Sequence, residues 1–371
     1  MSGTSTTGRR SATRSGAKRS SAKPGQASSA RGSAARGAAA AKNGAAARPS
    51  IGDILRPMAA DLELVADDIL GRLQHPVPRM VVYLITAGGK RLRPALTLLA
   101  GRSGDYEARR DHLIKLSSAV ELTHTATLIH DDIIDRSAMR RQQPTFHSRF
   151  GTERAVLMGD YLYATAFEAL AQIGDAYAMS HLASICQQMS RGEFQEVECR
   201  FKVDVTEQEY LQIVRDKTAS LIASCCHLGA YLSGASKDAV DRITRFGWEY
   251  GMAFQVIDDC LDLIGEEKMV GKPLRSDLDK GSLSLPVIYL ASSMGKAERR
   301  KLFAPLLNKQ TDRRFLARIA KEARRSGAID RAIASAKTFV RNAEAAITPT
   351  DGIGAAKTYH ELAAYAMTRM Q

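Results

Sequence analysis

Two short acidic motifs, "LIHDDIID" and "QVIDDCLD", each place aspartates in the spacing Asp-Asp-x-x-Asp within apolar sequence. Their acids are Asp131, Asp132 and Asp135 in the first motif and Asp258, Asp259 and Asp262 in the second. On a helix, residues four apart share a face, so the first and last acid of each motif point the same way. Carboxylates this close repel each other, and burying one costs several kcal/mol unless a cation neutralises it. The pattern therefore indicates a site that binds cations.

The chemistry of these ligands favours magnesium. Carboxylate oxygens are hard ligands, and Mg²⁺ typically takes one or two of them together with water and the phosphate oxygens of a substrate. Two such motifs on facing helices would bind several Mg²⁺ ions around one polyphosphate. A helix cap or a solvated charged face is the alternative, and it explains a single Asp-Asp pair better than two motifs in apolar surroundings.

Basic residues that suit phosphate accompany the acids. In "GGKRLRP", Lys90 and Arg93 follow two glycines, which let the backbone approach an anion closely. Pro94 suits the first turn of a helix, and helix N-termini attract phosphate. Arg140 and Arg141 follow the first acidic motif, and guanidinium groups bind phosphate oxygens in pairs. A basic surface turn is the alternative interpretation of the glycine-rich segment.

Two further cations stand at less informative places. Lys217, followed by Thr218, opens a long uncharged run, and Lys272 follows the second acidic motif. Lone lysines are usually solvated, so spacing alone does not select these two. The chain has no GxxxxGK[ST] loop, no GxGxxG after a strand and no HExxH motif. Metal-binding acids and phosphate-binding cations in an apolar chain therefore predict a diphosphate substrate with a large hydrophobic body.

Helices are expected to position all of these groups. From Ser50 to the C-terminus, apolar residues recur at helical spacing, aromatic residues make up only 6%, and no alternating strand or hairpin signal appears. The expected fold class is all-α. Beyond a first helix after Ser50, the predicted helices cover residues 76–86, 93–103, 109–135, 151–173, 176–200, 206–234, 237–266, 283–293, 297–306, 311–325, 327–345 and 353–370.

The first 49 residues differ from the rest of the chain. They are rich in Ala, Ser, Gly, Lys and Arg, and residues 1–48 contain ten basic and no acidic residues. Such a segment buries too little surface to fold, so we expect a disordered tail followed by one catalytic domain, residues 50–371. Because the net charge is +13, the other 323 residues carry only +3 and give no reason to invoke specific nucleic-acid binding. The tail could touch anionic membranes or nucleic acid weakly.

The remaining composition bears on the compartment. Five cysteines without CxxC spacing indicate reduced thiols and a cytoplasmic protein, with peripheral membrane contact through its product or its basic tail as an alternative. An organelle transit peptide is the less favoured interpretation of the tail. Residues 218–236 lack charged side chains but include five Ser or Thr, which favours a buried helix over a membrane span.

The segments "GGKRLRP", "HDDIID" followed by "RR", "GDYLYA", "KTASL" and "FQVIDDCLDLIG" followed by "GKP" occur in this order from about residue 51 onwards. In this combination the chain resembles the trans-polyprenyl diphosphate synthases (trans-isoprenyl diphosphate synthases), of the medium- and long-chain type that makes heptaprenyl, octaprenyl, solanesyl or decaprenyl diphosphate. The resemblance implies a single large helical bundle around a central cavity, the isoprenoid synthase type, and a homodimer. It also implies head-to-tail, trans condensation of isopentenyl diphosphate with an allylic prenyl diphosphate, by ionisation, condensation and elimination.

The resemblance assigns roles residue by residue. In the family, the residues matching the six aspartates bind Mg²⁺, three ions per active site, and Lys217 joins them as a catalytic residue. Positions matching Lys90, Arg93, His124 and Arg141 bind isopentenyl diphosphate. Positions matching Arg140, Lys217, Thr218, Gln255 and Lys272 surround the allylic diphosphate. One departure is Gln142, where the family usually has Gly after the paired arginines, and a side chain there restricts the turn.

Product length is expected to depend on the helix that carries the first acidic motif. Counting back from Asp131, the candidate positions are Thr123, Ala126 and Thr127, and eight residues span about 12 Å. Short-chain members of the family put aromatic residues near the acids, whereas these side chains are small. We therefore expect a long product, C30 to C50.

Several alternatives remain open. The chain could be a shorter-chain synthase that makes geranylgeranyl or farnesyl diphosphate, or the catalytic subunit of a heteromeric synthase that needs a small partner. A terpene cyclase would not need the "GGKRLRP" site, and a non-catalytic subunit would not need all six aspartates.

Overall fold

The computed structural model describes residues 50–73, 80, 83, 90–265, 276–348 and 355–369. The chain separates into two units, Met1–Ala47 and Arg48–Gln371, and only the second is described below. The expected tail, most of the predicted helix 76–86, and Lys272 lie outside the described residues.

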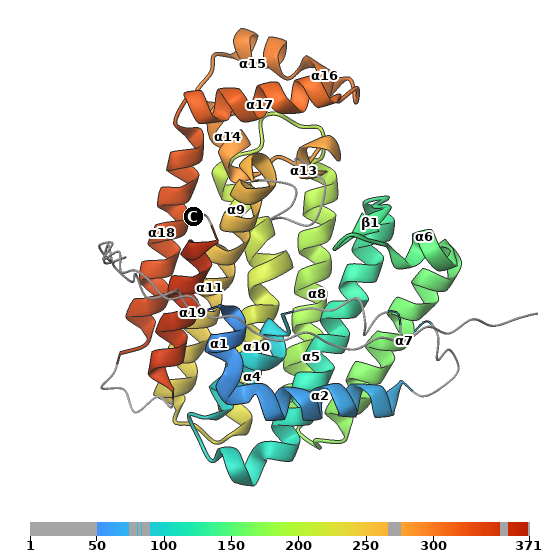
Figure 1. Cartoon of the computed structure of the whole chain (residues 1–371), viewed down its shortest axis with the longest axis vertical. Coiled ribbons are helices and arrows are strands. Elements are labelled where there is room, and N and C mark those ends of the chain that lie inside the picture. The colour runs from blue at the N-terminus through green and yellow to red at the C-terminus, as the bar shows by residue number, and fades with distance from the viewer. Residues whose placement is uncertain are drawn as a thin grey trace, which may run out of the picture. The chain divides into compact units, whose positions relative to one another are not determined.

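The described part of the second unit is built from helices, so the all-α expectation is confirmed (Figure 1). The elements before the central helices are α1 (Ile51–Leu55), η1 (Arg56–Met58), α2 (Ala59–Arg72), α4 (Leu92–Gly101), α5 (Tyr106–Ile134), α6 (Phe146–Phe150), α7 (Thr152–Ala171) and α8 (Ala176–Cys199). The following elements are α9 (Glu207–Val214), η2 (Arg215–Ala219), α10 (Ser220–Leu232), α11 (Lys237–Ile264), α13 (Ser276–Asp279), α14 (Leu285–Ser292), α15 (Lys296–Leu302), α16 (Ala304–Leu307), α17 (Arg313–Arg325), α18 (Ala328–Ala346) and α19 (Ala356–Thr368).

Side-chain caps explain where several helices begin. Ser50 and Thr206 each form a capping box with the acid three residues later, and Asp105, Asp175 and Ser236 cap α5, α8 and α11. These oxygens accept hydrogen bonds from backbone N–H groups that the first helical turn leaves unpaired. The two longest helices, α5 and α11, thus start at a defined residue, which fixes where their acidic ends lie.

Two local features differ from the sequence-based expectation. The predicted helix 206–234 is divided into α9, the π-helical turn η2, and α10. The expected absence of a hairpin is wrong, because β1 (Met139–Arg140) pairs with β2 (Gln143–Pro144) in antiparallel register. Arg141 and Gln142 form its two-residue turn with φ of 50° and 63°, as a type I′ turn requires. Since such turns usually carry Asn-Gly or Asp-Gly, Arg-Gln gave no signal.

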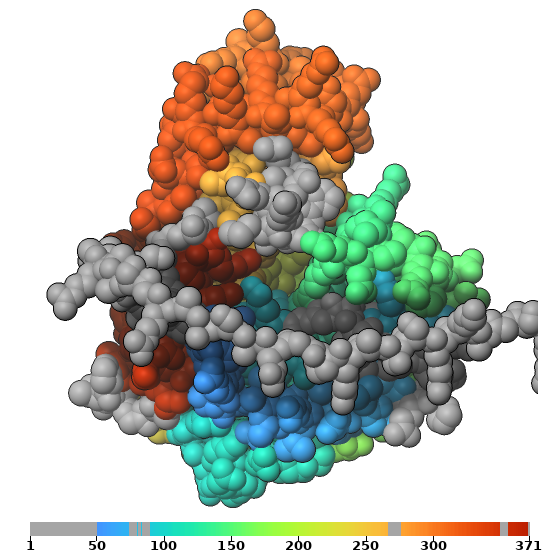
Figure 2. Space-filling view, viewed as in Figure 1, coloured from blue at the N-terminus to red at the C-terminus, as the bar shows by residue number. Residues whose placement is uncertain are grey.

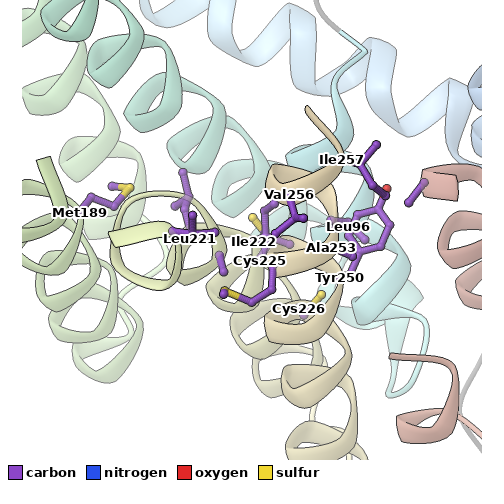
Figure 3. Packing of buried hydrophobic residues seen from close by; sticks show 14 of the residues in the cluster. Leu96, Met189, Leu221, Ile222, Cys225, Cys226, Tyr250, Ala253, Val256 and Ile257 are labelled. Atoms are coloured by element: carbon purple, nitrogen blue, oxygen red, sulfur yellow. The ribbon is translucent and has the colours of Figure 1, made fainter. Parts of the chain in front are cut away.

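Helix α10 lies at the centre of the bundle and packs against α4, α5, α8 and α11. The uncharged run is therefore a buried helix, as predicted, with Leu221, Ile222, Cys225 and Cys226 in the core. Figure 3 shows these residues beside Val256 and its neighbours on α11. None of the helices in the described ranges is both long and apolar enough to cross a bilayer.

The end of the unit beyond α13 and α14 is formed by α15, α16 and α17, whose long side chains project at the top of Figure 2. Helix α17 buries Phe315, Leu316 and Ile319 and turns its charged side chains outward.

Candidate active site

Both acidic motifs lie at the C-terminal ends of long helices. Asp131 and Asp132 are in the last turn of α5 and Asp135 is its C-cap, whereas the second motif occupies the last turns of α11. One short segment contacts both motifs. Ser276 Oγ donates to Asp262 Oδ1 at 3.1 Å, and Lys280 Nζ donates to Asp135 Oδ2 at 3.1 Å. Ser276 and Lys280 are only four residues apart, at the start of α13 and just after its end, so one short segment links the two motifs.

A second connection runs through η2, where Lys217 and Thr218 are adjacent. Thr218 Oγ1 donates to Gln255 Oε1 at 3.1 Å, and Gln255 Nε2 donates to Asp259 Oδ1 at 2.7 Å. Lys217 lies on the other side, where its charge acts on Asp131. Neighbouring residues of one π-helical turn therefore reach both acidic motifs. Such turns are rare overall and are frequently found at functional sites.

Two glutamates that sequence reasoning missed surround Lys217. Its Nζ is 2.7 Å from Glu196 Oε2 and also pairs with Glu193, both on α8. Gly192 permits this approach, since a Cβ there would lie 2.7 Å from the backbone nitrogen of Lys217. Burial opposes the charge of Lys217, but Glu196, Asp131 and Glu193 outweigh it and raise the pKa of the ammonium group. Lys217 is therefore a fully charged, fixed cation facing the first motif.

The three acids of the first motif have different environments. Asp132 accepts from Arg140 Nε at 3.0 Å, and Asp135 pairs with Arg200 at 2.5 Å as well as with Lys280. Burial raises the pKa of Asp132, whereas for Asp135 Lys280, Lys217 and Arg200 overcome the effect of burial and lower the pKa.

Asp131 is the exception in this motif. Its carboxylate makes no hydrogen bond or ion pair with any side chain among the described residues. Burial raises its pKa to about 7, and nearby Glu193 and Asp135 act in the same direction against Lys217. Lys217 and Arg140 favour the charged form from a distance, but they do not outweigh burial and the neighbouring acids.

The second motif is also tied to its surroundings. Asp259 is buried and accepts from Tyr210 Oη at 2.6 Å; burial, with Asp277 nearby, raises its pKa well above the usual range. Asp258 pairs with Arg369 at 2.6 Å, just after α19. Asp262 accepts from Ser276 and from the backbone N–H of Asp277.

These acids form an all-oxygen donor set that fits a divalent metal. Within the described ranges, no three His, Cys, Asp or Glu side chains converge on one point in ligand geometry, since several acids are turned toward basic partners. The chemistry of the set nevertheless matches a hard cation, and Asp131 in particular has no directly paired cation among the described residues, while its pKa is raised.

A basic site lies beside the first motif. Arg93 Nη1 donates to His124 Nε2 at 3.0 Å, and Lys90 Nζ donates to Tyr365 Oη at 3.1 Å. Burial, together with Arg93 and Arg141, lowers the pKa of His124 well below its usual range, so the imidazole is neutral and accepts from Arg93. Burial lowers the pKa of both guanidinium groups, Arg93 and Arg141; repulsion from Arg141 adds to this at Arg93, and repulsion from Arg140 adds to it at Arg141.

A cavity of about 320 Å³ opens at this site. Its polar lining includes His124, Glu121, Arg140, Arg141 and Asp132, and apolar side chains from α2, α4, α5, α6 and α7 contribute to the remaining wall. Such a combination of a few polar groups with apolar walls is typical of small-molecule sites.

The expected product-length positions all lie on α5. Thr123 and Ala126 are fully buried, and the Thr123 hydroxyl has no partner among the described residues. Thr127 is half-buried and donates to the His124 carbonyl at 2.7 Å. Met189 of α8 and Leu221 of α10, one turn from Glu193 and Lys217, are buried as well and were not identified from the sequence (Figure 3).

Comparison with known proteins agrees with this architecture. Residues 74–322 match the family model described as "Polyprenyl synthetase". The chain is 36% identical over 289 residues to heptaprenyl diphosphate synthase component 2 of Geobacillus stearothermophilus, covering 77% of this chain and 88% of that protein. It is 37% identical over 276 residues to geranylgeranyl diphosphate synthase of Saccharolobus solfataricus, covering 70% and 82%.

Solved structures show the same fold. A polyprenyl synthase from Caulobacter crescentus, in complex with calcium and isoprenyl diphosphate, superposes with a TM-score of 0.80 at 31% identity, covering 87% of this chain and 99% of that one. A decaprenyl diphosphate synthase from Rhodobacter capsulatus gives 0.79 at 30% identity, covering 87% and 100%. The chain therefore belongs to the polyprenyl synthetase family, whose members are prenyltransferases.

Proposed function

We propose that this prenyltransferase condenses isopentenyl diphosphate with an allylic prenyl diphosphate, head-to-tail and trans, to give a polyprenyl diphosphate of C30 to C50. The observation that carries the proposal is the convergence of both acidic motifs on residues 276–280 and on the pair Lys217–Thr218. A site with acids on two walls and fixed cations between them suits a metal-bound diphosphate.

The allylic diphosphate is assigned to the space between the two motifs. The six aspartates would hold three Mg²⁺ ions, which when bound neutralise the diphosphate and stabilise it as a leaving group. Arg140, Lys217, Thr218 and Gln255 would bind its oxygens directly. Lys272 is proposed on its sequence match alone.

Isopentenyl diphosphate is assigned to the neighbouring basic site. Lys90, Arg93 and Arg141 supply the positive charge, and neutral His124 adds a ring nitrogen without adding charge repulsion. The pair Arg93–His124 is already in contact at 3.0 Å, so the guanidinium is oriented before substrate binds.

In the proposed reaction, the allylic C–O bond breaks and leaves negative charge on the diphosphate and positive charge on carbon. Lys217 and Arg140 stabilise the diphosphate, and the apolar walls keep water from the carbocation. The double bond of isopentenyl diphosphate forms the new C–C bond, and a proton then leaves to the released diphosphate.

The long product is supported by the small side chains of Thr123, Ala126 and Thr127, and by relatives named heptaprenyl and solanesyl diphosphate synthase. A geranylgeranyl diphosphate synthase at 37% identity supports the shorter-chain alternative.

The deciding experiment uses radiolabelled isopentenyl diphosphate with farnesyl and geranylgeranyl primers, with Mg²⁺ and after chelation. Chromatography of the dephosphorylated products should show C30 to C50. Products of C20 or shorter would support the alternative, and cyclised products without incorporated label would indicate a terpene cyclase.

Oligomeric state is proposed to be a homodimer that associates through α7 and α8. Leu157 and Phe194 are 67% and 72% exposed, and Val156 and Val197 beside them are also exposed, which is unusual for large apolar side chains on a free surface. Phe194→Glu should yield monomers in analytical ultracentrifugation.

Two relatives are named "component 2", so activity of the purified single chain tests whether a small partner subunit is needed.

We further propose that residues 50–371 form the catalytic domain and that the protein is cytoplasmic, with residues 1–49 as an accessory tail. Loss of condensation activity on deleting residues 1–48 would contradict this division.

A further inference from the structure

Charge in the chain is distributed more unevenly than the totals suggest. Of the net +13, the tail accounts for +10, and residues 296–325 contain eleven basic and three acidic residues, a net +8. The rest of the chain therefore carries −5. The small net charge of the folded part conceals one strongly basic region in an otherwise acidic body.

The basic region is a surface rather than a set of ion pairs. Helix α17 exposes Arg313, Arg314, Arg318, Lys321, Arg324 and Arg325. Only Arg325 among these six has a described acidic partner, Glu322. Four further exposed cations lie on α15 and in the turn after α16. We call these ten exposed side chains the basic face; its long side chains project at the top of Figure 2.

The basic face stands directly beyond the candidate active site. Thr311, just before α17, donates to Asp279 Oδ1 at 2.6 Å. Asp279 ends α13, the helix whose Ser276 contacts Asp262 and which Lys280 follows. Lys309 lies 5.2 Å from the ring of Phe201, next to Arg200, the partner of Asp135. The basic face is therefore connected to both acidic motifs through a few residues.

We propose that the basic face docks this enzyme on the surface of an anionic lipid bilayer, with its substrate-binding end toward the membrane. This inference rests on the proposed function, because a long polyprenyl product is insoluble in water and has to pass into lipid. The apolar stripe of α17 is buried in the bundle, so the contact is electrostatic and peripheral, without insertion.

Two observations favour a lipid surface over nucleic acid. Phe303 and Phe315, the aromatic residues of 296–325, are 0% and 5% exposed, so this fully described stretch offers no ring on which an unpaired base could stack. The six cations also spread along a helix of 13 residues, about 20 Å long, which suits a layer of head groups.

The test compares two charge reversals in the full-length chain, so that the tail is the same in all proteins. The first variant is Arg318→Glu with Lys321→Glu, in the basic face. The matched control is Arg109→Glu with Lys237→Glu, which reverses two exposed cations near the starts of α5 and α11. Both control positions are about 30 Å along their helices from the acidic motifs.

Flotation is measured with phosphatidylcholine vesicles, with and without about one third phosphatidylglycerol, at about 0.1 M salt. A cation near such a surface contributes about five-fold to partitioning, so losing two of them should weaken binding to anionic vesicles by at least about 25-fold, and the two introduced carboxylates should weaken it further. The control should stay within about two-fold of the parent chain, since its cations face away from the membrane.

Three results would overturn the proposal: equal binding by the basic-face variant and the parent chain, equal loss in the control, or no preference of the parent chain for anionic vesicles. Loss of binding to a structured RNA, with vesicle binding retained, would identify nucleic acid as the partner instead. Condensation activity is assayed separately in solution, with a short primer and no vesicles. Absence of condensation activity in the parent chain would refute the proposed function. The flotation result would still test, independently of activity, whether the basic face binds anionic membranes.

Discussion

Asp131→Asn should stabilise the metal-free protein, whereas replacing a buried, paired acid usually destabilises a protein. The carboxylate is largely buried and forms no direct ion pair among the described residues, and its pKa is raised to about 7 from 3.8. Because the folded state retains this proton more readily than the unfolded state, stability falls as pH rises from about 4 to 7 and is level above that. The free energy of unfolding of the metal-free protein therefore decreases toward alkaline pH.

The size of the effect follows from the same shift. About three pKa units correspond to about 4 kcal/mol, which we reduce to about 2 kcal/mol because the carboxylate is partly accessible to solvent. The interval from pH 6 to pH 7 covers about one of the three units, so about 0.7 kcal/mol of this loss should appear there. Asp131→Asn removes the charge, and the variant should be about 2 kcal/mol more stable than the parent chain at pH 8.

Urea unfolding in the presence of chelator at pH 6 and pH 8 measures both quantities. Asp135→Asn is a matched control in the same motif, since Lys280, Lys217 and Arg200 lower the pKa of Asp135. That variant should be less stable than the parent chain by a similar amount at both pH values. If both Asn variants lose stability at pH 8, the assignment of Asp131 as the unpaired acid is refuted.

Three further predictions concern other parts of the site. Ala126→Phe should shorten the product, as chromatography would show, because Ala126 is fully buried on α5; an unchanged length distribution would move the limit to Leu221 and its neighbours. Glu196→Gln should lower kcat about ten-fold with little change in KM for isopentenyl diphosphate, since it loosens Lys217; an unchanged kcat would remove Glu196 from the site. Gln142→Gly should stabilise the chain by about 0.5–1 kcal/mol in urea unfolding, because its φ is 63°; a loss of stability would show that the side chain matters more than the turn.

The sequence predicted the helical fold and the family correctly because both depend on patterns that are local. Helical periodicity, caps such as Ser236 and the uncharged run that became α10 can each be recognised within a few turns. The site residues named from the sequence stay predictions of role, although the structure places the described ones around one region. Lys272 is outside the described residues.

The partners of the acids could not be predicted because they come from distant parts of the chain. Arg200 contacts an acid 65 positions earlier, Lys280 one 145 positions earlier, and Arg369 one 111 positions earlier. None has a motif of its own, and a single Arg or Lys is usually solvated. Glu193 and Glu196 had a weak signal, two acids on one face of α8 directly after a glycine, but only the approach of η2 gives them a partner. The basic face was hidden because charge was summed over the whole folded part.

The ion pairs of the site also predict how metal and diphosphate should bind. Asp132, Asp135 and Asp258 are each paired with an arginine in this structure. A metal that takes these carboxylates leaves the guanidinium groups without partners, which is costly for half-buried charges. A diphosphate bound at the same time supplies oxygens for the released arginines, because guanidinium groups pair with phosphate as readily as with carboxylate.

Metal and diphosphate should therefore bind cooperatively. Calorimetry of Mg²⁺ binding should show at least ten-fold tighter affinity, about 1.4 kcal/mol, when a non-cleavable allylic diphosphate analogue is present. Equal affinity with and without the analogue would mean that the arginines do not leave the acids, and the proposed exchange of partners would be wrong.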